Sequence, residues 1–151
     1  MMVDEPTTIA GWTPDNYAVA RPGELREYSN IGAALAGHIV ERTLDLPLQR
    51  AARASVFEPL GMSSTGWSPD DVDLARHTTH YVSHNGMAVP IPLYVNTTYP
   101  DGGVRTSVND LARFFIALLN DGVHRGTRIL DAESVRELRR FQFKDEDRPS
   151  N

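Results

Sequence analysis

The sequence predicts a mainly helical unit that carries one β-hairpin. Apolar stripes at helical spacing indicate the helices, and an Asn85-Gly86 pair between two strand-like segments indicates the hairpin. With 151 residues, of which 40% are hydrophobic, the chain is long enough for one ordinary domain with a moderate core. We therefore expect one folded unit over residues 1–141 and a flexible tail over residues 142–151, where no apolar periodicity remains.

The composition argues against several classes of partner and site. A formal charge of −5 at pH 7, spread without long blocks, argues against binding to a nucleic-acid backbone, which needs clustered basic surface. No apolar run approaches the roughly 20 residues of a membrane span, and the first residues do not have the pattern of a secretion signal, so a soluble chain with no membrane partner is expected. Without cysteine there is no disulfide, thiolate metal site or thiol nucleophile. The cellular compartment is left open.

The strongest helical pattern covers residues 30–44. Its apolar stripe consists of Ile31, Leu35 and Ile39. Alanines between these residues favour a helix, and Ser29 or Asn30 is suited to cap its amino end. A helix over about 30–44 is the firmest of the predicted elements.

Prolines and glycines divide the rest of the amino-terminal half. Residues 1–27 are rich in Pro, Thr, Asp and Gly, which predicts an irregular lead-in. A second, shorter helix is expected near residues 47–56, because Pro47 suits a first helical turn. Pro59 and Gly61 then prevent the helix from continuing.

Residues 76–94 have the spacing of two strands around Asn85-Gly86, whose residues accept the positive φ angles of a tight turn. Pairing outward from the turn sets His80 against Ile91 and Val82 against Val89, which gives one mostly apolar face. Pro90 and Pro92 cannot donate ladder hydrogen bonds, so the second strand is expected at an edge.

Two helices are expected in the carboxyl-terminal half. Ser107 and Asp110 form an N-terminal capping pattern for a helix that should end near residues 120–122. Its apolar residues, expected in the core, are Leu111, Phe114, Phe115, Leu118 and Leu119. Asp131 is suited to cap a last helix. The apolar residues of that helix are Val135 and Leu138.

The histidines invite a metal-binding or catalytic interpretation that their spacing does not favour. Strand alternation would point His77 and His80 to opposite faces, so these two and His84 are expected as surface residues and not as metal ligands. His38 follows Ile31 on the same helical stripe and is expected as a hydrogen-bonded boundary residue, not as a catalytic base.

Three segments, in order along the chain, carry the motifs of one protein family. Residues 21–32 contain Pro-Gly followed by Tyr-Ser-Asn. Residues 57–65 match Phe-x-Pro-Leu-Gly-Met-x-x-Thr, and residues 102–111 resemble Gly-Gly … Ser-Thr-Ala-x-Asp-Leu. Together, over about residues 20–140, they resemble the serine β-lactamase-like proteins, which include class C β-lactamases, D,D-peptidases and related esterases.

The resemblance implies the helical region of the β-lactamase/transpeptidase-like (α+β) fold, without most of its antiparallel sheet. It gives Tyr28 the position of the proton-transfer tyrosine, and Asn30 that of the amide that contacts substrate and the catalytic lysine. It also implies that Gly102 and Gly103 shape the rim of a cleft, although both could simply form a positive-φ turn. No metal or organic cofactor is implied. Without the resemblance, Tyr28 would be interpreted as an aromatic packed at a helix start beside an Asn cap.

The sequence departs from the family in the residues that react. Such enzymes use Ser-x-x-Lys and a later Lys-Thr-Gly or His-Thr-Gly. Lys144 is the only lysine here; Phe141 lies three residues before it and Asp145 follows it, so it completes neither motif. A tyrosine of ordinary pKa, about 10, is ionised only about one part in a thousand at pH 7. We therefore expect a piece of a serine hydrolase that does not turn over substrate alone.

Two further expectations follow from the resemblance. The intact parent would hydrolyse a small acyl substrate, a β-lactam, a D-Ala peptide or an ester, through an acyl-enzyme. A helical region built to pack on a sheet leaves apolar faces open, so the chain is expected to self-associate or to bind a complementary fragment. The alternative is a non-catalytic module that binds a ligand or protein through the same cleft wall.

Overall fold

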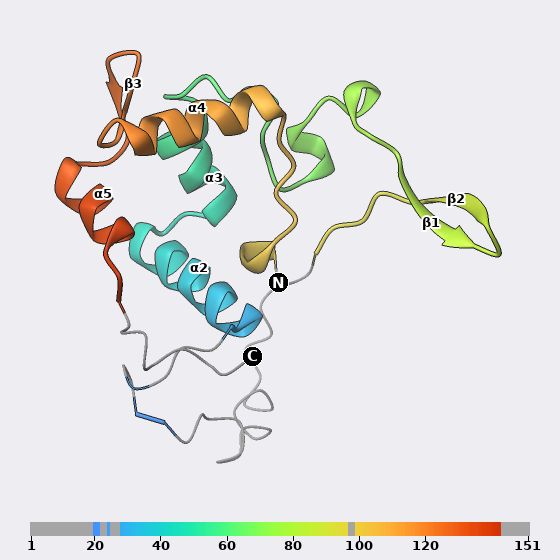
Figure 1. Cartoon of the computed structure of the whole chain (residues 1–151), viewed down its shortest axis with the longest axis horizontal. Coiled ribbons are helices and arrows are strands. Elements are labelled where there is room, and N and C mark those ends of the chain that lie inside the picture. Colours follow the sequence, from blue (N-terminus) through green and yellow to red (C-terminus); the bar gives the residue numbers. More distant parts are fainter. Residues whose placement is uncertain (1–19, 22–23, 25–27, 97–98, 143–151) are drawn as a thin grey trace. The chain divides into compact units, whose positions relative to one another are not determined.

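The computed structural model describes residues 20–21, 24, 28–96 and 99–142. The chain divides into two compact units, one of residues 29–140 and one of residues 1–28 with 141–151, and each is described by itself. The first unit contains the labelled helices and strands of Figure 1. The lead-in predicted over residues 1–27 and the tail predicted over 142–151 lie almost entirely outside the described residues.

Helix α2 (Asn30–Leu44) has the bounds that the sequence predicts. Ser29 caps it, because the Ser29 Oγ accepts a hydrogen bond of 2.9 Å from the Gly32 N–H. The helix ends at Asp45, which has a positive φ of 50°. Its apolar stripe is exposed, with accessible fractions of 67% for Ile31, 56% for Leu35 and 56% for Ile39. This helix therefore carries an apolar face that the described residues cover by less than half.

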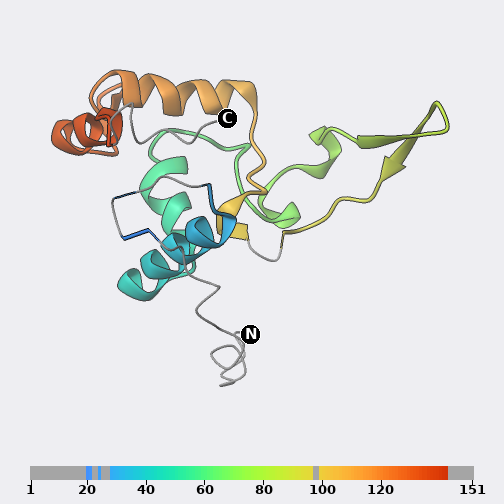
Figure 2. The same ribbon diagram turned by 60° about the horizontal axis from the view of Figure 1, so that its bottom comes forward.

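The second predicted helix is confirmed as α3 (Leu48–Ala52), which widens into the π-helical turn η2 (Arg53–Phe57). Gly61 follows with a positive φ of 66°, which ends the helical path. Helix α4 (Val108–Leu119) lies across α3 in both views (Figures 1 and 2). The core beneath α4 consists of Phe57 of η2, Leu60 and Met62 of the turn that follows, and Ala117 of α4, with Phe114 and Trp67 packed against it.

The predicted cap of α4 is confirmed, because the Ser107 Oγ accepts a hydrogen bond of 3.1 Å from the Asp110 N–H. The prediction that the whole apolar stripe of α4 is core is wrong. Phe114 packs on the core, but Phe115 is 52% exposed and Leu119 is 73% exposed. The reason is that η2 and the turn after it cover only one side of α4, and the apolar stripe is wider than that contact.

The predicted hairpin is confirmed as β1 (His80–His84) and β2 (Met87–Ile91), with the expected pairs His80–Ile91 and Val82–Val89. Asn85 and Gly86 have positive φ angles of 50° and 78°. Among the described residues this sheet has two strands, so β2 is at an edge as expected. Figure 2 shows the hairpin reaching away from the helices of its unit, and its apolar face is largely exposed.

The prediction of a single hairpin is wrong. A second, very short one joins β3 (Val123–His124) to β4 (Thr127–Arg128). Its turn consists of Arg125 and Gly126, which have positive φ angles of 48° and 83°. Gly126 suits such a turn but Arg125 does not, so the pair lacks the Asn-Gly or Asp-Gly signature that would have predicted a hairpin.

The last helix, α5 (Ala132–Arg139), is capped as predicted by Asp131, whose Oδ1 accepts a hydrogen bond of 2.7 Å from the Ser134 N–H. Val135 is buried and anchors the helix, whereas Leu138 is 68% exposed. The described part of the chain contains no helix with the length and hydrophobicity that a membrane crossing needs.

Candidate functional site

Tyr28 and Asn30 lie on either side of the residue that caps α2. Tyr28, the last residue of its own unit before α2 begins, is 90% exposed. Asn30 is the first residue of α2 and is also exposed. Because Ser29 makes the cap and the Tyr28 ring is not packed, the interpretation of this pair as a packed aromatic beside an Asn cap is wrong. Both the phenol and the amide are open to solvent.

Gly102 and Gly103 follow the short 3-10 turn η5 (Tyr99–Asp101). Gly103 has a positive φ of 79°, so the interpretation of this pair as a positive-φ turn is confirmed at Gly103. A Cβ on Gly103 would lie 3.6 Å from the Asn96 Cβ, which is ordinary contact. Glycine is needed here for its backbone conformation and not for space.

Turn η5 is held against the middle of α2. The Tyr99 hydroxyl donates a hydrogen bond to the Glu41 carboxylate, which also accepts one of 2.9 Å from the Leu48 N–H. A Cβ added to Gly37 would lie 2.5 Å from the Pro100 Cβ, so only glycine allows this approach. The two predicted glycines are therefore attached to the helix that begins with the predicted substrate-binding amide.

The contact between η5 and α2 also changes the titration of its groups. The hydrogen bonds from the Leu48 N–H and the Tyr99 hydroxyl lower the pKa of Glu41. Burial, together with the hydrogen bond to Glu41, raises the pKa of Tyr99 to about 12. The prediction of His38 as a boundary residue is confirmed, because its side chain is partly buried; its Nδ1 lies 3.8 Å from the Glu41 Oε2, within ion-pair distance but longer than a hydrogen bond. The Glu41 carboxylate instead accepts from Leu48 and Tyr99.

Asp110 joins two of the three motif segments, a role that the capping pattern did not predict. Its carboxylate is buried, and its Oδ2 accepts hydrogen bonds of 2.7 Å from the Ser64 N–H and 3.0 Å from the Thr65 hydroxyl. Its Oδ1 pairs with Arg113 at 2.7 Å. The co-occurrence of the two motifs was the available signal, but helical spacing alone does not reveal a contact across 45 residues.

Arg105 was also missed. Its backbone pairs with that of Gly66, with N···O distances of 2.8 and 3.0 Å. Its guanidinium donates hydrogen bonds to the carbonyl oxygens of Trp67, Tyr94 and Gly103, the last at 3.2 Å. Arg105 therefore fixes the segment that contains the predicted glycines onto the turn that follows the core.

The histidine pair differs from the prediction. His77 precedes strand β1, so strand alternation does not apply to it, and its ring stacks on that of His80 with centroids 5.7 Å apart. The prediction that the two rings point to opposite faces is wrong. Over the described ranges, no group of three or more His, Asp or Glu side chains could hold a metal ion.

Comparison with known proteins gives the family. The family described as Beta-lactamase matches residues 6–150. An uncharacterised protein of Mycobacterium tuberculosis (strain CDC 1551 / Oshkosh) is 33% identical over 135 residues, which cover 85% of this chain and 33% of that protein. A beta-lactamase of Providencia stuartii is 26% identical over 104 residues, which cover 68% of this chain and 25% of that enzyme.

The solved structures agree. The octameric penicillin-binding protein homologue from Pyrococcus abyssi superimposes with a TM-score of 0.73 and 26% identity, over 91% of this chain and 30% of that chain. This chain spans a third or less of the length of each of these relatives. The resemblance found in the three motif segments is confirmed, and the chain belongs to the Beta-lactamase family.

Proposed function

We propose that this chain provides the tyrosine and amide wall of an acyl-transfer site in a serine hydrolase. Tyr28 moves a proton between the nucleophile and the leaving group, and Asn30 holds the substrate amide or carbonyl. The observation that carries the proposal is that both side chains are exposed beside the capped start of α2, in a chain of the Beta-lactamase family.

The nucleophile comes from other polypeptide in this proposal. The printed sequence contains neither Ser-x-x-Lys nor Lys-Thr-Gly, the motifs that supply the acylated serine and the lysine. A tyrosine relays a proton well only when nearby positive charge lowers its pKa from about 10. The chain alone therefore has neither the motif serine that accepts the acyl group nor the motif lysine whose charge would lower the pKa of the tyrosine.

The exposed stripe of α2 supports this division of the site. An apolar stripe along one side of a helix is normally buried against another element. Ile31, Leu35 and Ile39 are more than half exposed, and the chain spans a third or less of the length of the M. tuberculosis and P. abyssi relatives. We infer that the stripe is covered by the part of the same fold that carries the serine, and that glycines 102 and 103 border the resulting cleft.

Hydrolysis assays test the proposal. The isolated chain should hydrolyse neither a chromogenic cephalosporin nor a nitrophenyl ester faster than its Tyr28→Phe variant. A chimera in which residues 20–142 replace the matching segment of the Providencia stuartii beta-lactamase should lose about 10²–10⁴-fold in kcat on Tyr28→Phe. Tyr81→Phe, at an exposed tyrosine of β1, is the control and should leave kcat unchanged.

Two results would contradict the proposal. Turnover by the isolated chain that Tyr28→Phe abolishes would show that no other polypeptide is needed. A folded, active chimera that is indifferent to Tyr28→Phe and Asn30→Ala would remove both residues from the site.

A separate experiment tests whether the exposed apolar stripe of α2 needs to be covered by another polypeptide. Light scattering should detect association of the isolated chain, and Leu35→Glu should shift it toward monomer because a charge interrupts the stripe. Ala33→Glu places the same charge on the opposite side of the helix and should leave the association unchanged. A dilute wild-type chain that stays monomeric with a cooperative melt would argue against a stripe that needs a cover.

A further inference from the structure

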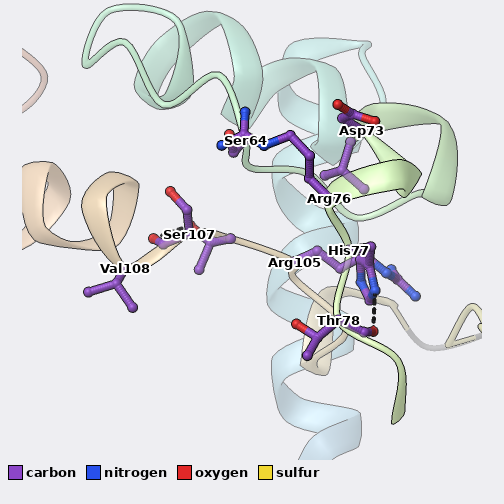
Figure 3. A pocket seen from close by; sticks show the side chains of 10 residues that line it. Ser64, Asp73, Arg76, His77, Thr78, Arg105, Ser107 and Val108 are labelled. Carbon is purple, nitrogen blue, oxygen red and sulfur yellow. Dashed lines mark hydrogen bonds between the residues drawn. The ribbon is translucent and has the colours of Figure 1, made fainter.

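A cavity of about 330 Å³ lies between the turn after the core, the 3-10 turn η4 (Leu74–Arg76) and the start of α4. Figure 3 shows its lining, in which eight of the ten residues are polar or charged. Its lining residues all belong to one compact unit, and none of them is Tyr28, Asn30, Gly102 or Gly103. The cavity is therefore a feature that the acyl-transfer proposal does not use.

The charges around the cavity favour an anion. Arg76 and Arg105 contribute two positive charges to its lining and Asp73 contributes one negative charge, although the whole chain has a formal charge of −5. Neither arginine lies within ion-pair distance of a carboxylate among the described residues. The Asp73 carboxylate is used locally, where its Oδ1 accepts a hydrogen bond of 3.0 Å from the Ala75 N–H.

The two arginines differ in their freedom. The guanidinium of Arg105 is fixed by hydrogen bonds to three carbonyl oxygens, which hold it in place without neutralising its charge. The guanidinium of Arg76 has no hydrogen-bond partner in the part of the chain that the structure describes. In Figure 3 the side chain of Arg76 points toward Ser64, across the cavity. A free guanidinium beside a fixed positive charge is suited to bind an oxyanion with two parallel hydrogen bonds.

Hydroxyl donors complete the lining. The Ser107 Oγ accepts a hydrogen bond from the Asp110 N–H, which leaves its proton free to donate. The backbone of Ser64 is fixed by its N–H bond to Asp110, while its hydroxyl has no partner among the described residues. His77 adds an imidazole whose Nδ1 lies 2.7 Å from the Thr78 carbonyl oxygen. A volume of about 330 Å³ is at the small end of ligand pockets.

We propose that this cavity binds a small oxyanion, a carboxylate or phosphate group. Arg76 contacts the anion directly, Arg105 supplies fixed positive charge, and the hydroxyls of Ser64 and Ser107 donate hydrogen bonds to it. The small volume of the cavity limits the ligand to a small anion. The residues of this site are not those of the proposed acyl-transfer site.

Titration of the intact chain with inorganic phosphate and with succinate, followed by NMR, tests this proposal and separates the two ligand chemistries. At least one anion should give saturable shifts at the amides of Ser64, Arg76 and Ser107, whereas sodium chloride at the same ionic strength should not. Loss of one charge-assisted contact in Arg76→Gln should weaken binding on the order of tenfold or more. Arg50→Gln, at an exposed arginine that does not line the cavity, should bind as the wild type does.

A second variant keeps the test valid if Arg76→Gln is poorly folded. Val108 lines the cavity, is 85% exposed and stands at the first position of α4. A glutamate there repels an anion, and an acidic residue in a first helical turn favours the helix. Val108→Glu should therefore abolish binding without lowering the melting temperature. The proposal is overturned if the wild type shows no saturable shifts with either anion at tens of millimolar, or if folded Arg76→Gln and Val108→Glu variants bind as the wild type does.

Discussion

The hairpin β1–β2 and the layer beneath α4 are held together by opposite means. The hairpin is local: its register follows from the Asn85-Gly86 turn, and nine of its ten strand residues are exposed. The layer beneath α4 depends on distant contacts, because Asp110 binds Ser64 and Thr65 from across the chain and Ala117 is fully buried in the core.

This difference indicates which contacts determine the free energy of unfolding of the unit. A hairpin that buries little can open without unfolding the rest, whereas a buried carboxylate that joins two segments belongs to the global unfolding unit. Substitutions beneath α4 should therefore lower the free energy of unfolding of the whole unit, and substitutions in the hairpin should act on the hairpin alone.

The largest effect is expected for Asp110→Ala. The substitution removes two hydrogen bonds and leaves Arg113 without its carboxylate, so it should lower the free energy of unfolding by about 3–5 kcal/mol. Urea denaturation measures this loss. Asp70→Ala, at an exposed aspartate, should change stability by no more than about 0.5 kcal/mol. Equal effects of the two substitutions would mean that Asp110 does not join the segments.

A smaller loss is expected for Gly37→Ala, which tests the contact between α2 and η5. The added Cβ would lie 2.5 Å from the Pro100 Cβ and must displace η5, at a cost of about 1–3 kcal/mol. Gly32→Ala adds the same group on the same helix, where the nearest atom is the Ser29 Cβ at 3.3 Å, and should cost less. Thermal melts of both variants provide the comparison, and an equal or larger loss for Gly32→Ala would contradict the tight approach.

The contact between Glu41 and Tyr99 should make stability depend on pH at both extremes. The pKa of Glu41 is lowered in the folded chain, so its contribution is present above its unfolded value of 4.5 and is lost as pH falls through the folded value. The pKa of Tyr99 is raised to about 12, so its contribution is present below a tyrosine's ordinary pKa and is lost as pH rises through 12.

Glu41→Gln should therefore lower stability by about 1 kcal/mol near pH 7 and flatten the loss in acid. Urea midpoints measured from neutral to acidic pH give this profile. Glu58→Gln, at an exposed glutamate, should retain the wild-type profile. An unchanged acid profile in Glu41→Gln would assign the acid sensitivity to other carboxylates.

The smallest global effect is expected for Gly86→Ala, in the hairpin. Alanine at a φ of 78° should destabilise the turn by about 1 kcal/mol and speed hydrogen exchange at the amides of β1 and β2. The midpoint of global unfolding should not change, nor should exchange in α4. Ser83→Ala, an exposed change in β1, should leave exchange at wild-type rates. A shift of the global midpoint in Gly86→Ala would show that the hairpin belongs to the same cooperative unit as the core.

The same division explains what the sequence could predict. The bounds of α2, the caps at Ser107 and Asp131, and the register of the hairpin all follow from neighbouring residues, and all are confirmed. The turn at Arg125 was not predicted, because Gly126 follows an arginine, which does not favour a positive φ, and the flanking strands have only two residues each. The exposure of Phe115 was missed as well, because a helical stripe does not show which neighbour covers it.

The candidate site divides in the same way. Motifs identified Tyr28 and Asn30, and the structure adds that Asn30 is not the cap. The contacts that hold the candidate site residues in place could not be predicted from local patterns. Glu41 contacts Tyr99 across 58 positions, and Arg105 contacts Trp67 across 38. Such pairs are set by tertiary packing, for which a single sequence offers no periodicity.

The paired backbones of Gly66 and Arg105 bring the two ends of residues 67–104 together, so the intervening chain leaves and rejoins the core at one point. The entropic cost of closing such an excursion grows only slowly with its length. Insertions, deletions or new side chains in the exposed hairpin of this excursion, residues 80–91, should therefore leave the helices nearly undisturbed, whereas changes in η5, which contacts α2, should not. The hairpin could therefore change in length and sequence while the contacts that stabilise the fold, beneath α4 and between α2 and η5, stay the same.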